Sequence, residues 1–135
     1  MEKNFYDLII FGSGLSAKAM SLVARNAGLS FKIIADKNFG NITNDDTRSL
    51  ALSVASKKML QVLGADIKTE AVKKMVVIEG GLADEKIKSR LTFDRGLVDE
   101  DIAYIAEYSV IEKSLDKALK LKDIEFSRDE VIDIQ

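Results

Sequence analysis

The chain has 135 residues, enough for one domain with a hydrophobic core and too few for two domains of ordinary size. Apolar residues make up 47% and charged residues 31%, and the net charge of -2 gives no electrostatic support for a nucleic-acid partner. The absence of cysteine and histidine excludes disulfides, thiolate nucleophiles, serine-histidine triads and metal sites built from these residues. We therefore expect no metal and no nucleic acid, and any chemistry would depend on a bound cofactor.

Features of a targeting or membrane segment are missing. Nothing in the sequence approaches the roughly 20 apolar residues of a membrane span. Glu2 and Asp7 stand where a signal peptide would be cationic and then apolar. A cytoplasmic protein is the expectation.

The first motif in chain order is a strand, a glycine turn and a helix. The apolar run from Leu8 to Phe11 predicts a buried parallel strand. Gly12-x-Gly14-x-x-Ala17 follows it and fits the dinucleotide-binding fingerprint. Gly12 permits the tight turn, Gly14 lets a pyrophosphate approach the helix N-terminus, and Ala17 keeps the helix close to the strand. These residues alone predict a site for NAD or FAD equally, and the alternative is a turn that binds nothing.

The helix after this turn is predicted to run from about residue 14 to 26 and to stop at Gly28. Ala17, Met20 and Ala24 recur at helical spacing, so we expect them on its packing face.

A second strand is predicted from Phe31 to Ala35, and it ends at Asp36. Asp36 lies 22 residues after Gly14 (36 − 14 = 22). In dinucleotide folds an acidic residue about 20 residues after the glycines accepts hydrogen bonds from the ribose. Asp36 is therefore a candidate ribose ligand, and the alternative is a simple strand-end carboxylate.

Residues 37–47 are polar and predict a loop that leads into a second helix. Ser53 is the expected N-cap of this helix, and Gly64 marks its end. The side chains expected to point inward are Ala55, Met59, Leu60 and Leu63.

The second half of the chain predicts shorter elements. Residues 73–79 and 90–93 are β-prone and predict either a hairpin or two strands of a small sheet. Residues 109–112 match a capping box that opens a helix, and residues 124–126 and 131–134 are short strand candidates. The expected buried stripe of that helix consists of Ile111, Leu115, Ala118 and Leu119.

Read together, several segments resemble the N-terminal part of the flavin-dependent aromatic hydroxylases, in particular the ubiquinone-biosynthesis hydroxylases of the octaprenyl-methoxyphenol type. The segments that carry this resemblance are YDLIIFGSG at 6–14, DTRSLALS at 46–53, LQVLG at 60–64, MVVI at 75–78 and AYIAE at 103–107. The resemblance covers essentially the whole chain and is most specific in DTRSLALS.

This resemblance implies an α/β fold, namely an incomplete Rossmann-like FAD-binding domain with a βαβ start, a parallel sheet and a few strands of a substrate-side sheet. Residues 1–135 would form a single truncated domain. About 1–64 would bind the dinucleotide, about 72–95 would supply substrate-side strands, and about 102–135 would return to the FAD-binding domain.

The resemblance also implies that Arg48 lies beside the flavin and its pyrophosphate, where a guanidinium can bind phosphate oxygens bidentately. The alternative is a surface arginine paired with Asp45 or Asp46. The implied cofactor is FAD, and NAD(P)H would be the reductant only in a complete enzyme.

Two motifs of the family do not occur in the sequence: an Asp-Gly segment that helps bind pyridine nucleotide and flavin, and a Gly-Asp-Ala-Ala-His-like segment that holds the ribityl chain and pyrophosphate. The resemblance therefore implies a chain that binds the ADP half of FAD and is not active alone. The expected partner is a separately encoded C-terminal remainder, and the complete enzyme would act on an aromatic quinone precursor, at a membrane surface if that substrate is apolar. The alternatives are a stand-alone FAD- or NAD-binding module and a non-binding remnant of a split gene.

Overall fold

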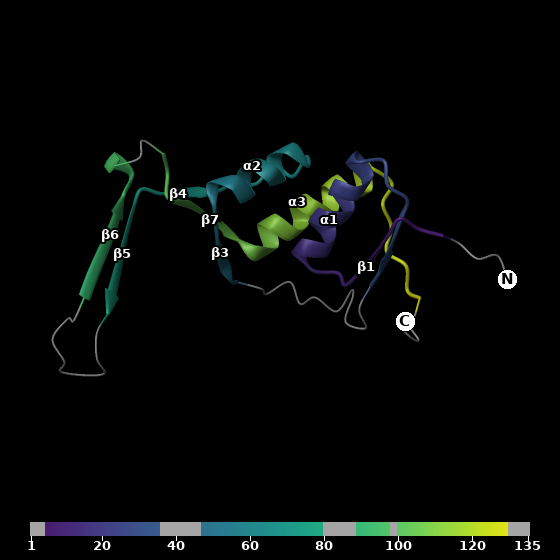
Figure 1. Ribbon diagram of the computed structural model, residues 1–135, viewed down its shortest axis with the longest axis horizontal. Coiled ribbons are helices and arrows are strands. Elements are labelled where there is room, and N and C mark those ends of the chain that lie inside the picture. Colours follow the sequence, from purple (N-terminus) through teal and green to yellow (C-terminus); the bar gives the residue numbers. More distant parts are fainter. Residues whose placement is uncertain (1–4, 36–46, 80–88, 98–99, 130–135) are drawn as a thin grey trace.

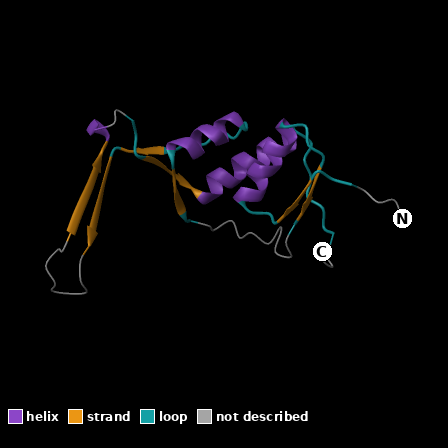
Figure 2. Ribbon diagram, in the orientation of Figure 1, coloured by secondary structure: helices purple, strands orange, loops and turns teal. Residues whose placement is uncertain are grey.

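The computed structural model describes residues 5–35, 47–79, 89–97 and 100–129, and within these ranges it has a mixed α/β fold. Figure 1 shows the helices grouped at the centre, a small pair of strands on one side and a long hairpin on the other. Figure 2 shows how loops join these three parts. A βαβ unit at the start forms a parallel pair of strands, and the other described strands belong to antiparallel sheets.

The βαβ unit consists of β1 (Leu8–Phe11), α1 (Leu15–Asn26) and β2 (Phe31–Ile34), so the predicted strand-turn-helix-strand is confirmed. Leu8 lies opposite Phe31 in the parallel register. Helix α1 ends as predicted. Gly28 adopts φ 71°, and the N–H groups of Gly28 and Leu29 donate to the carbonyls of Arg25 and Ala24 near the end of the helix.

A segment near the far end of the chain lies on the other side of β2. Ile34 and Ser127 form a parallel bridge, in which Ala35 N–H donates to Ser127 O (2.9 Å) and Ser127 N–H donates to Ile33 O (2.8 Å). The spatial order is therefore the Ser127 segment, β2 and β1. The prediction of a strand at 124–126 is wrong in detail, because the pairing occurs at Ser127 and is limited to one bridge. The strand candidate at 131–134 lies outside the described residues.

The middle of the chain forms an antiparallel sheet in the order β3 (Ser49–Leu52), β7 (Ala103–Glu107) and β4 (Glu70–Val72). No strand is predicted at residues 49–52, and they form β3 because β7 supplies a pairing partner from a distant part of the chain.

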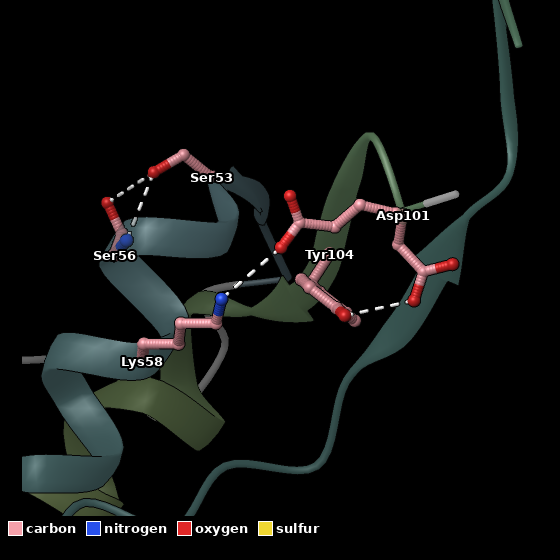
Figure 3. A network of polar contacts seen from close by, with 6 residues as sticks. Ser53, Ser56, Lys58, Asp101 and Tyr104 are labelled. Carbon is pink, nitrogen blue, oxygen red and sulfur yellow. Dashed lines mark hydrogen bonds and ion pairs between the residues drawn. The ribbon is translucent and has the colours of Figure 1, made fainter. Parts of the chain in front are cut away.

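Helix α2 (Val54–Val62) follows this strand, and Ser53 caps it as predicted. The Ser53 hydroxyl accepts a hydrogen bond from Ser56 N–H at 3.0 Å (Figure 3). Gly64, with φ 86°, ends the helix in the same way as Gly28 ends α1. Of the four predicted inward side chains, Leu60 is buried like Leu63, whereas the side chains of residues 55 and 59 are exposed.

Helix α3 (Tyr108–Leu121) follows β7 without a loop, and its N-cap residue is Glu107. The predicted capping box at 109–112 is wrong, because the helix begins at Tyr108 and Ser109 already lies in its first turn. The predicted buried stripe is confirmed for all four members: Ile111, Leu115, Ala118 and Leu119.

The hairpin consists of β5 (Lys74–Glu79) and β6 (Ser89–Asp94), followed by the short 3-10 turn η1 (Arg95–Leu97). The two strands pair only with each other in the described part of the chain, so of the two predicted arrangements the hairpin is confirmed. It extends away from the helices (Figure 1).

One hydrophobic core joins the three helices to the parallel strands and to β7. Leu22 of α1, Ile33 of β2 and Leu115 of α3 are almost completely buried in it. The expectation for α1 is wrong at Met20, which is 49% exposed, whereas Ala24 is buried. The buried face of α1 is turned toward α3 relative to the expected face, because α1 packs against α3. The spacing of apolar residues within α1 does not reveal this.

Within the described ranges, no helix is both long enough and apolar enough to cross a lipid bilayer.

Candidate nucleotide-binding site

The glycine turn connects the carboxyl end of β1 to the start of α1. Gly12 has φ 121°, a conformation that side chains rarely adopt, and its N–H donates to Ile34 O of β2 at 2.9 Å. This bond anchors the turn to the neighbouring strand. The turn therefore requires glycine at position 12 for conformational reasons alone.

Gly14 differs from Gly12, because its backbone needs no special freedom. It is the N-cap of α1 with φ −74° and ψ 178°, which any residue can adopt. A Cβ added at Gly14 would have no neighbouring atom within 4 Å. The space in front of Gly14 is therefore open, and a glycine at this position leaves the backbone accessible to a ligand.

The N-terminus of α1 presents backbone donors to this space. The first N–H groups of a helix have no partner within the helix, and Gly14 has no side chain to cap them. The first turn of α1 also contains no acidic residue that would compensate the positive end of the helix dipole. Together these features favour an anionic group such as a phosphate.

Ala17 lies one turn into α1 and is half-buried against the core. Its carbonyl accepts a hydrogen bond from the Ser21 hydroxyl at 2.7 Å. A small residue at this position is consistent with close packing of the helix beside the strands.

Arg48 precedes β3, outside the glycine turn. Its carbonyl accepts the N–H of Tyr108 at 2.8 Å, and its guanidinium lies over the Tyr108 ring at 4.6 Å from the centroid. In Figure 1 the start of β3 and the carboxyl ends of β1 and β2 face the same lower side of the molecule. Asp45 and Asp46, the alternative ion-pair partners of Arg48, lie outside the described residues, as does the candidate ribose ligand Asp36.

The opposite end of the parallel pair is closed by Asp7 and Ser30, which precede β1 and β2. The Asp7 carboxylate accepts the Ser30 N–H at 2.8 Å and the Ser30 hydroxyl at 2.7 Å. These two hydrogen bonds hold the pKa of Asp7 below its ordinary value of 3.8, with the hydroxyl as the larger cause.

Asp7 is therefore expected to stabilise the fold above its ordinary pKa, and the contribution should disappear as pH falls through the lower folded-state pKa. The urea midpoint of the Asp7→Asn variant should lie below that of the unmodified protein near neutral pH and should converge with it in acid. Ser30→Ala should reduce this pH dependence without abolishing it, because it removes the hydroxyl and keeps the backbone N–H that also donates to Asp7. If the urea midpoints of Asp7→Asn and the unmodified protein differed by the same amount at all pH values, this role of Asp7 would be contradicted.

A buried ion cluster between α1 and α3 was not predicted from the sequence. Lys18 is 1% exposed, and its Nζ lies 3.0 Å from Glu112 Oε1 and 2.7 Å from Asp116 Oδ1. Glu112 is buried, whereas the Asp116 side chain is 45% exposed. Lys18 follows Leu15 by three residues and precedes Leu22 by four, so helical spacing places it on the same face as these two apolar residues. This spacing is the pattern in the sequence that indicates a buried Lys18.

A second polar cluster surrounds Tyr104 in the AYIAE segment (Figure 3). The Tyr104 hydroxyl donates to Asp101 Oδ2 at 2.9 Å, and this hydrogen bond raises the pKa of Tyr104. Arg95 Nη1 lies 3.2 Å from Asp101 Oδ1, and the Lys57 ammonium lies 3.6 Å from the centroid of the Tyr104 ring. The cluster joins β7 to α2 and to the base of the hairpin, so its evident role is structural.

The described residues contain no group of three or more Asp and Glu side chains that could hold a metal ion. The chemistry that the glycine turn supports is anion binding by backbone amides. A scan of the chain against protein-family models gives no match, and neither does a comparison with curated proteins.

Proposed function

We propose that this chain binds the ADP half of FAD at the glycine turn, as the N-terminal portion of a flavin-dependent monooxygenase like the ubiquinone-biosynthesis aromatic hydroxylases. The observation that carries the proposal is the open space at Gly14, whose backbone does not otherwise need a glycine. Beside it, the uncapped N–H groups of α1 favour the pyrophosphate.

The arrangement of the strands supports the same proposal. In dinucleotide-binding domains the third parallel strand lies beside the second, and the ligand crosses the carboxyl ends of the strands next to the first. The order of the Ser127 segment, β2 and β1 has this form, although the third position is a single bridge. The glycine turn lies at the carboxyl end of β1.

Arg48 and Asp36 complete the proposed set of cofactor-binding residues with Gly12, Gly14 and Ala17. The guanidinium of Arg48 would bind the pyrophosphate. To do so, it would either move away from the Tyr108 ring or contact the ring and the pyrophosphate at the same time. Asp36 would accept hydrogen bonds from the ribose.

When bound, FAD would supply hydride acceptance and oxygen activation, which no side chain of this sequence can perform. This chain's residues would bind and orient the ADP half only. We therefore propose that hydroxylation of an aromatic quinone precursor with NAD(P)H needs a further polypeptide that carries the remaining flavin contacts.

Matched single-methyl substitutions at the two glycines test the proposal. Gly14→Ala should change the free energy of unfolding by at most about 1 kcal/mol, because its backbone and surroundings accept a Cβ. The same change should weaken FAD binding about 10- to 150-fold by blocking one charge-assisted contact to the pyrophosphate. Flavin fluorescence titration measures the affinity, and thermal unfolding measures the stability.

Gly12→Ala is the control and should show the opposite pattern in stability, with a loss of about 1–3 kcal/mol from the strained backbone. If the bulkier Gly14→Val variant binds FAD as tightly as the unmodified protein, the proposed site is wrong. Binding of NAD in preference to FAD would instead favour a stand-alone nucleotide-binding module. Protein that binds neither would leave only a structural remnant.

A further inference from the structure

The hairpin exposes an apolar face that nothing in the described residues covers. All six residues of β5 are exposed, and the four from Met75 to Ile78 are apolar. Met75 lies opposite Phe93 and Val77 opposite Leu91, so these four side chains share one face of the hairpin. An isolated two-stranded hairpin is at best marginally stable in water, and independent stability needs three or more strands with a hydrophobic face or packing against a helix.

The two outer edges of the hairpin differ in how well they are protected against pairing. Along β6, polar residues alternate with Leu91 and Phe93, and Asp94 bonds back to Gly96 N–H at 3.0 Å. Along β5, four consecutive apolar residues are interrupted by no charge. Charged and polar residues are the usual protection of an edge strand, so β5 is the edge open to another strand.

The sequence of β5 is complementary to itself in one antiparallel register. Strands related by a two-fold axis perpendicular to the sheet must pair residues that lie on the same face. With the axis at Val76, Met75 faces Val77 of the second copy and Lys74 faces Ile78 of the second copy. Lys73, which directly precedes β5, faces Glu79 of the second copy. On the face that carries Met75 and Val77, opposite charges thus meet at both ends of an apolar centre.

From this complementarity we infer that two copies of the chain associate through their β5 edges. The result is a four-stranded antiparallel sheet in the order β6-β5-β5-β6, with a continuous apolar face made from both copies. The association does not depend on the flavin site, because the hairpin and the glycine turn occupy opposite sides of the molecule (Figure 1).

Engineered cysteines test the register directly, since the sequence contains no cysteine. In the Val76→Cys variant the two thiols lie opposite each other across the axis, within the Cα separation of about 4.4–6.8 Å that a disulfide spans. In the Val77→Cys variant the two thiols lie on a diagonal of about 7–8 Å. Mild oxidation followed by non-reducing electrophoresis should show covalent dimers at least about tenfold faster for Val76→Cys than for Val77→Cys. Equal rates, or faster reaction of Val77→Cys, would overturn the register.

Charge variants test the association itself by light scattering after size-exclusion chromatography. Lys73→Glu and Glu79→Lys should each raise the dimer dissociation constant about tenfold or more, because like charges then face each other twice. Mixing the two variants should restore dimers, since both charge pairs become attractive again. Lys113→Glu, the same charge change on an exposed position of α3, should leave the dimer intact. A monomer for the unmodified protein at all concentrations, or no restoration on mixing, would overturn the proposal.

Discussion

Lys18→Met is expected to lower the free energy of unfolding by about 3–5 kcal/mol, because it leaves the buried Glu112 carboxylate without its cationic partner. The ammonium of Lys18 bridges α1 and α3, and Glu112 is only 8% exposed in the folded protein, so its carboxylate has little access to water that could replace Lys18. Urea denaturation monitored by circular dichroism measures the loss.

The double variant Lys18→Met/Glu112→Leu separates the charge from the packing. Replacing a buried ion pair by apolar residues of similar size is often neutral or stabilising, so the double variant should recover most of the lost stability. Asp116→Asn is the matched control on the exposed side of the cluster and should cost at most about 1 kcal/mol. If the double variant were as unstable as Lys18→Met, an uncompensated Glu112 charge would not be the cause.

Leu22→Ala should cost about 2–5 kcal/mol, because its side chain is fully buried between the helices and the parallel strands and its removal leaves a cavity. Met20→Ala, two residues earlier on the same helix, should change stability by at most about 0.5 kcal/mol, since Met20 is largely exposed. The pair of variants measures which face of α1 packs inward, by the difference between their thermal or urea midpoints. Comparable losses for both would mean that Met20 also faces the core.

Local signals in the sequence predicted the βαβ unit. The apolar run of β1, the φ requirement of Gly12 and the helix stop at Gly28 are each set by a few neighbouring residues. The Ser53 cap is equally local, because its hydrogen bond reaches only to Ser56. Such features depend on nothing distant, so a single sequence contains them in full.

The features that sequence reasoning missed depend on partners far along the chain. Lys18 is buried because Glu112, 94 residues away, neutralises it. The strand at 49–52 exists because β7 pairs with it, and α3 starts early because β7 runs directly into it. Met20 was assigned to the wrong face for the same reason, since the position of α3 decides how α1 is turned.

In the candidate site too, some residues are positioned by local signals and others by partners distant in the chain. Gly12, Gly14 and Ala17 are positioned by the local turn, and the structure places them together as predicted. The stacking of Arg48 on Tyr108 joins residues 60 positions apart (108 − 48 = 60), and no local pattern indicates it. FAD binding by these residues stays a prediction, and Asp36 lies outside the described residues.

The bridge between Ile34 and Ser127 has a consequence for how the protein is made. Its two residues are separated by 93 positions (127 − 34 = 93). At ordinary rates of synthesis of about 5–20 residues per second, the βαβ unit waits about 5–19 s on the ribosome before its last strand partner is added. During that interval α3 is also missing for most of the time, so Leu22 and the charge of Lys18 face water or a chaperone. Completion of the parallel sheet is therefore a late event, set by translation of the second half of the chain.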